Sequence, residues 1–445
     1  MLALAIWLAA APLGAQPATV GPAERPLSLE EALELAEARS EQLAAARAGV
    51  VRARGEEQRA ASERWPLVTL AASYDRTLAS EFEGLFDRPS AEPADGVDFG
   101  RLPFGRENIW RINLSVSQPL YTAGRIAAGR AAARAGRAGA EIAMASARAQ
   151  VLLDVIRAYF DAALADRLVA IAEGAYRQAD AAFRQTQLGR QAGTQPEFEL
   201  LRAQVARDTQ RPAVIRRRAE REIAYFRLKQ LLDLPAGEPL RLTTELDGAR
   251  EAPVRIAPTA ASTAPPVAPP RAPVRQAEQA LRASEATVAA ARAERLPAVT
   301  LSTFYGRVNY PSGVLPELAD FRTNWTVGVN VQLPIFTGGR LKAAEAIARA
   351  QVDEARARLQ QARELAALDT LAAHEELEAA RAAWEASAGT VQQAARAYEI
   401  AELRYRQGIS TQLELADARL LLEQAQVNRA VAARDLQIAR ARVAL

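Results

Sequence analysis

The chain has 445 residues; 49% are hydrophobic, largely alanine, only 6% are aromatic, and 24% are charged, a composition typical of long packed helices. Its 56 basic and 53 acidic residues nearly cancel and are spread along the chain, which argues against nucleic acid as the main partner. Cysteine is absent, which excludes disulfides, thiolate metal sites and lipidation of an N-terminal cysteine.

The first 15 residues have the pattern of a signal peptide. An apolar run from Leu2 to Leu13 is followed by Gly14 and Ala15, and it is too short to span a bilayer as a helix. We therefore expect export and cleavage near Ala15. No later stretch reaches the roughly 18 apolar residues of a transmembrane helix. An exported chain that contacts a membrane would have to do so through β-strands.

The first half, residues 16–249, begins with a capping box at Ser28, which starts a helical run to about residue 63. Strands are predicted at about 67–77 and 110–118, separated by a loop rich in glycine, proline and phenylalanine. In the second strand, apolar residues from Trp110 onwards alternate with polar ones, which gives one apolar and one polar face. Pro119 marks the end of this strand.

A stretch without proline from 125 to 192 predicts a helix of about 100 Å. Gly193 breaks this helix, and a return helix is expected at about 196–232. Residues 250–273 are rich in proline and alanine and are typical of an extended linker.

The same order of elements returns in residues 274–445. After a first helix, we expect strands at about 299–310 and 325–332, a long helix at about 340–407 and a return helix at about 411–445. The landmark pairs Trp110 and Trp325, Pro119 and Pro334, Arg125 and Arg340, and Gly193 and Gly408 are each 215 residues apart. This common spacing indicates two tandem repeats, each a β-hairpin with long antiparallel helices. The alternative is that alanine-rich helices resemble each other by composition alone.

Strands of 9 to 11 residues with a tryptophan near one end suit a membrane β-barrel with an aromatic girdle. Four strands cannot close a barrel, and an open edge is not stable in lipid. The chain would therefore pool strands with its own copies. A dimer would give eight strands and a trimer twelve, and only the larger ring leaves an obvious aqueous lumen. A soluble coiled-coil filament would explain the helices but neither the strands nor the signal peptide.

Three segments carry a family resemblance: the strand-to-helix junctions QPLYTAGR, with Gly124, and LPIFTGGR, with Gly339, and the segment RYRQGISTQLELADAR at 404–419. With these the chain resembles the TolC-type outer-membrane efflux proteins. The resemblance implies a mainly α fold with a membrane β part, a trimer with a 12-strand β-barrel and a 12-helix α-barrel in the periplasm. It also implies a periplasmic adaptor and an inner-membrane transporter as partners, and no enzymatic activity, cofactor or metal.

The resemblance further implies a gate near Gly408. Family members place acidic residues six and nine positions after this glycine, here Glu414 and Asp417, which would favour cations at a narrow aperture. Tyr405 matches an aromatic residue that helps to hold the tip closed. In the first half the equivalent acidic position is Glu199.

Other readings of these residues stay open. Glu414 also fits a capping box with Thr411, and Asp417 also fits a solvated helix face. Ser410 occupies the position at which some members carry a latching arginine. His374 is the only histidine, and we find no catalytic constellation.

The sequence thus predicts the exit duct of a tripartite efflux pump for small molecules in the outer membrane of a Gram-negative-type envelope. The exit duct of a type I protein secretion system is an alternative, and a periplasmic structural coiled-coil protein is a second one. Trp110 and Trp325 would lie at the membrane interface.

Overall fold

The computed structural model describes residues 24–79, 107–247, 271–311 and 313–444 and is mostly helical. The predicted signal peptide and nearly all of the first loop and the linker lie outside these residues. The chain forms two compact units. We call Ala45–Ser146 with Pro265–Leu368 the sheet unit, and Met1–Ala44, Ala147–Ala264 and Asp369–Leu445 the helical unit. Among the described helices, none combines the length and the apolar character needed to cross a membrane.

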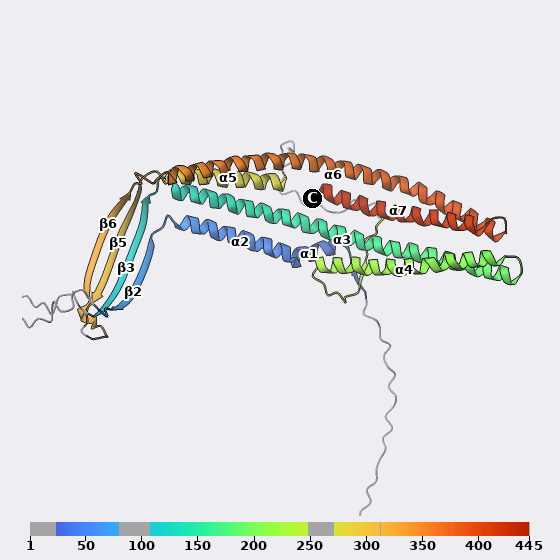
Figure 1. Ribbon diagram of the computed structural model, residues 1–445, viewed down its shortest axis with the longest axis horizontal. Coiled ribbons are helices and arrows are strands. Elements are labelled where there is room, and N and C mark those ends of the chain that lie inside the picture. Colours follow the sequence, from blue (N-terminus) through green and yellow to red (C-terminus); the bar gives the residue numbers. More distant parts are fainter. Residues whose placement is uncertain (1–23, 80–106, 248–270, 312, 445) are drawn as a thin grey trace, which may run out of the picture. The chain divides into compact units, whose positions relative to one another are not determined.

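The sheet unit contains an antiparallel sheet of four strands in the order β2-β3-β5-β6 (Figure 1). The strands are β2 (Leu67–Arg76), β3 (Asn108–Tyr121), β5 (Ala298–Asn309) and β6 (Arg322–Gln332), and the short helix η2 (Leu318–Asp320) precedes β6. β3 continues past Pro119, where we expected it to end. Because proline lacks an N–H, the ladder adapts there, and the register with β5 shifts between Pro119 and Tyr121.

The helices of the sheet unit are α2 (Glu41–Ser62), α5 (Ala272–Ala293) and the first parts of α3 (Arg125–Gln191) and α6 (Arg340–Arg406). α3 and α6 have 67 residues each. Small side chains let α5 and α6 approach closely, and Val288, Ala348 and Val352 form a small core between them.

The helical unit contains α1 (Leu29–Arg39), α4 (Glu197–Leu231), α7 (Gln412–Ala444) and the remaining parts of α3 and α6. The capping box at Ser28 is present: the Glu31 amide donates to Ser28 Oγ at 3.2 Å, and the Ser28 amide donates to Glu31 Oε2 at 3.0 Å. Two three-residue strands, β1 (Arg25–Leu27) and β4 (Leu240–Leu242), pair in parallel.

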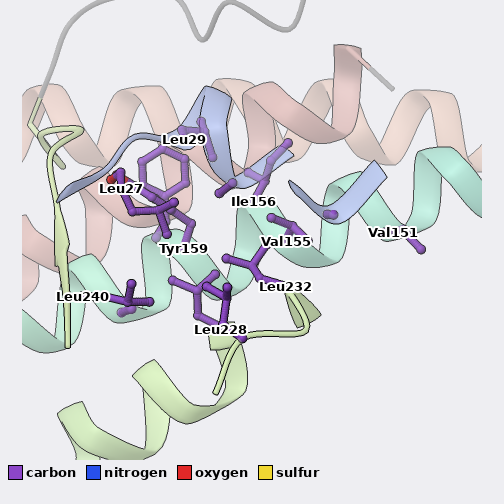
Figure 2. Packing of buried hydrophobic residues seen from close by; sticks show 14 of the residues in the cluster. Leu27, Leu29, Val151, Val155, Ile156, Tyr159, Leu228, Leu232 and Leu240 are labelled. Carbon is purple, nitrogen blue, oxygen red and sulfur yellow. The ribbon is translucent and has the colours of Figure 1, made fainter. Parts of the chain in front are cut away.

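A single apolar cluster, shown in Figure 2, joins these short strands to the helices. Its labelled members are Leu27, Leu29, Val151, Val155, Ile156, Tyr159, Leu228, Leu232 and Leu240. The fully buried Tyr159 hydroxyl donates to the Leu27 carbonyl at 2.9 Å and accepts from the Thr244 amide at 3.0 Å. These two bonds satisfy the buried hydroxyl and tie β1 and the segment after β4 to α3.

Candidate functional site at the helix tips and the sheet

Two glycines turn the long helices of the helical unit. Gly193, between α3 and α4, and Gly408, between α6 and α7, both have φ of +73°. The Gly408 amide donates to the Tyr405 carbonyl at 3.0 Å, and the Ile409 amide donates to the Arg404 carbonyl at 2.9 Å. Side chains strongly disfavour this left-handed conformation, so glycine is the residue that allows each helix to end in a tight turn.

Tyr405 makes a buried contact between α6 and α3. Its hydroxyl oxygen lies 2.6 Å from Thr186 Oγ1, and the two residues are 5% and 1% exposed. Thr186 uses its single hydroxyl hydrogen to donate to the Ala182 carbonyl at 2.8 Å. Tyr405 is therefore the donor in the shared hydrogen bond.

Glu199, in the first turn of α4, lies near this pair. Burial raises the pKa of the Tyr405 phenol above its usual range, and the Glu199 carboxylate raises it further. One carboxylate oxygen of Glu199 is buried and has no hydrogen-bond partner among the described residues. The structure thus brings Tyr405 and Thr186 into contact, with Glu199 close enough for its charge to act on the Tyr405 phenol.

Glu414 and Asp417 are exposed on α7. The Glu414 amide donates to Thr411 Oγ1 at 3.4 Å, which is a long helix-capping contact. The Glu414 carboxylate itself lies 3.8 Å from Arg404 Nη1. No contact in the described part of the chain joins Glu414 or Asp417 to Tyr405.

Sequence reasoning missed Thr186 and the burial of the Arg419 guanidinium. Thr186 lies among the polar residues Arg184, Gln185 and Gln187, and nothing in its spacing distinguishes it from them. Arg419 lies within the tip motif; burial lowers the pKa of its guanidinium, and its Nε atom has no hydrogen-bond partner in the described structure. The tip therefore holds more buried polar groups than the acidic pattern indicated.

The backbone at the strand-to-helix junctions also adopts the left-handed conformation. Gly124 and Gly339 have φ of +87° and +86°, and Ala123 and Gly338 before them have +51° and +58°. Pro334 follows the end of β6, whereas Pro119 lies within β3.

The two tryptophans near the far end of the sheet differ in exposure. Trp110 is half-buried and donates from Nε1 to the Val314 carbonyl at 2.9 Å. Trp325 is 70% exposed and donates from Nε1 to Thr303 Oγ1 at 3.0 Å. In a single chain, Trp325 is therefore largely exposed, whereas Trp110 is not.

The register places mostly apolar residues in rows across one face of the sheet, with Arg307 and Thr323 in the row next to Tyr305 and Trp325. The cross-strand rows are Leu70, Leu114, Tyr305 and Trp325, and Val68, Val116, Thr303 and Val327. The opposite face carries Ala71, Asn113, Gly306 and Asn324, and Ser73, Arg111, Val308 and Arg322. Leu70 is 70% exposed and Val327 is 66% exposed, so the described residues leave this apolar face uncovered.

The family profile described as "Outer membrane efflux protein" matches residues 32–233 and 271–445, which is most of the chain. The chain belongs to the outer membrane efflux protein family. Its fold is that of a channel protein and not of an enzyme.

Individual relatives and a solved structure agree with this assignment. Nodulation protein T of Rhizobium leguminosarum bv. trifolii is 28% identical over 289 residues, 62% of this chain and 59% of that protein, so the chain spans less than two thirds of this relative. Protein CyaE of Bordetella pertussis is 30% identical over 373 residues, 82% of this chain and 73% of that protein. The Campylobacter jejuni CmeC outer membrane channel has the same fold, with a TM-score of 0.77, 20% identity, and coverage of 94% of this chain and 85% of that one.

Proposed function

We propose that this protein is the outer-membrane exit duct of a tripartite efflux pump, which passively conducts small molecules to the exterior. One observation carries the proposal: the open apolar face of the sheet, with Trp325 70% and Val329 62% exposed. Exposure of this face to water costs about 25 cal/mol per Å² of apolar surface, and lipid removes that cost. A sheet with one apolar and one polar face can stand between lipid and an aqueous lumen.

The two unpaired strand edges of the sheet are an argument for assembly of the chain into a trimer. Of the described strands, β2 and β6 are hydrogen-bonded on one side only, and every residue of both strands is exposed. Unpaired strand edges are not stable in lipid, so the sheet has to be closed by other copies. Three copies give a 12-strand β-barrel wide enough for a lumen, and their helices give a 12-helix tunnel in the periplasm.

The helix tips provide the gate in this proposal. The Tyr405–Thr186 hydrogen bond joins α6 to α3, while Glu414 and Asp417 are exposed and Glu199 lies beside Tyr405. In a trimer these carboxylates would converge around the aperture and favour cations there. A periplasmic adaptor and an inner-membrane transporter would meet the chain on the periplasmic side.

The test begins with fractionation of cells that express the full chain. We expect a trimer in the outer membrane that is stable to detergent and dissociates on heating, and that forms discrete channels in planar bilayers. A monomer in the periplasmic fraction would overturn the proposal and favour a structural coiled-coil protein. The co-purifying transporter identifies the cargo, and recovery of a protein exporter would favour type I secretion.

A further inference from the structure

Each of the four strand–helix junctions combines a basic residue with an exposed, large apolar side chain. Before β2 and β5 the two residues are adjacent; after β3 and β6 they are four residues apart. The pairs are Arg64 with Trp65, Arg295 with Leu296, Arg125 with Tyr121, and Arg340 with Phe336. The four apolar side chains are 62%, 51%, 53% and 90% exposed, respectively.

All four junctions lie at the same end of the sheet. Leu67 is paired with Ser117, Tyr121 with Val299, and Ala298 with Gln332. Figure 1 shows the strands meeting their helices at this end. The basic residues therefore form one level across the sheet, which we call the junction level.

The junction level has more positive than negative charge. In the first half, six arginines and three glutamates lie in residues 56–64 and 125–137. In the second half, five basic and two acidic residues lie in residues 287–295 and 340–352. Arg295 pairs with Glu345 at 3.0 Å, and Arg340 lies 3.9 Å from Glu294.

Two junction arginines of the first half, Arg64 and Arg125, have no such partner in the described structure. The Arg64 guanidinium lies 4.9 Å from the centroid of the Trp65 ring, and Arg125 is exposed. Neither side chain forms an ion pair with an acidic residue in the described structure. Both are therefore available to an external anion.

Helix stability does not explain this charge. α3 and α6 begin at Arg125 and Arg340, and neither has an acidic residue in its first turn. The N-terminus of a helix carries partial positive charge, so a cation there is unfavourable. An anion at the junction level would offset that cost.

We propose that the junction level binds the phosphate groups of anionic phospholipids in the leaflet next to the helices. This inference rests on the proposed insertion of the sheet into a membrane. Exposed aromatic rings belong at the headgroup level of a bilayer, and Arg64 and Arg125 would lie beside the lipid phosphates. Each basic residue near an anionic surface strengthens binding by about fivefold, which corresponds to about 1 kcal/mol.

The test compares two double variants of the full chain as a detergent-solubilised trimer. Arg64→Gln with Arg125→Gln removes the arginines that flank β2 and β3, neither of which forms an ion pair in the described structure. Arg275→Gln with Arg282→Gln is the matched control, because both residues are exposed on α5 of the same unit and form no ion pair in the described structure. Arg282 lies 13 residues before Arg295, about 20 Å along the helix.

Phosphatidylglycerol and phosphatidylcholine are titrated separately, and the unfolding temperature and the number of retained lipids are measured. We expect phosphatidylglycerol to stabilise the wild type and the control more than phosphatidylcholine does. Its apparent dissociation constant should rise at least fivefold in Arg64→Gln with Arg125→Gln, while conductance stays unchanged. Equal responses in all three proteins, with channels intact, would overturn this inference alone. A wild type that neither inserts into vesicles nor conducts would overturn it together with the proposed function.

Discussion

At the scale of single residues, the Tyr405 hydroxyl joins two helices through one hydrogen bond of 2.6 Å. Tyr405→Phe keeps the ring and removes this bond, which is worth about 1 kcal/mol. If the bond belongs to the closed tip, the closed-to-open ratio falls about fivefold, and we expect more frequent openings in planar bilayers. Tyr398→Phe is the control, because it lies on the same helix and its ring is also partly buried. Identical openings in the two variants would show that the Tyr405 bond is not part of the gate.

The exposed carboxylates at the tip give a second prediction. Glu414→Ala with Asp417→Ala should raise single-channel conductance and weaken block by multivalent cations, because negative charge would be lost at the narrowest point. Glu375→Ala with Glu378→Ala removes two exposed carboxylates at the same spacing on α6 and should leave both quantities unchanged. Unchanged cation block in the first variant would remove Glu414 and Asp417 from the aperture.

At the scale of elements, Glu345 holds α5 to α6 in the sheet unit. Its side chain is 8% exposed, and it contacts Arg292 at 3.1 Å, Arg295 at 3.0 Å and Arg349 at 2.5 Å. The hydrogen bond from Arg292, together with the charges of the other arginines, lowers the pKa of the Glu345 carboxyl below its ordinary value of 4.5. At a pH near 4.5, the Glu345 carboxyl is therefore protonated more readily in the unfolded chain than in the folded one.

The contribution of Glu345 to stability is consequently complete above pH 4.5 and is lost as the pH falls through the lower folded-state pKa. We expect Glu345→Gln to reduce the unfolding temperature at pH 7, because three arginines lose their anion. The difference from the wild type should shrink towards pH 3. Glu354→Gln, on an exposed face of the same helix, is the control. A difference that does not depend on pH would contradict the ionic role.

The elements themselves were predictable to different degrees. The proline-free stretches and the alternating strands locate α3, α6, β3 and β6 because their periodic patterns extend over many residues. β1 has only three residues, and its place depends on the core around Tyr159, so no local pattern marks it. The pairing of Tyr405 with Thr186 likewise joins residues 219 positions apart, whereas the glycine turns are visible in the sequence.

At the scale of the whole molecule, the proposed insertion into a membrane would depend on the apolar face of the sheet. Val327 lies in the middle of β6 on this face, and Thr326 points to the opposite face. An arginine at the bilayer midplane of a lipid-facing strand costs about 2 to 4 kcal/mol, and a lumen-facing one costs less. We expect Val327→Arg to reduce the amount of channel that floats with outer-membrane vesicles, and Thr326→Arg to insert like the wild type. Equal insertion of both variants would contradict the assigned faces.

The two edge strands have a genetic consequence. In a closed ring of three copies, β6 of each subunit would have to pair with β2 of the next. One edge strand that cannot pair would therefore prevent closure of the whole barrel. If a chain with a blocked β2 is produced in equal amount beside the intact one and mixes freely, only about one ring in eight contains intact subunits alone. Such an allele should act dominantly over the normal copy, whereas an allele that prevents folding of the chain should be recessive.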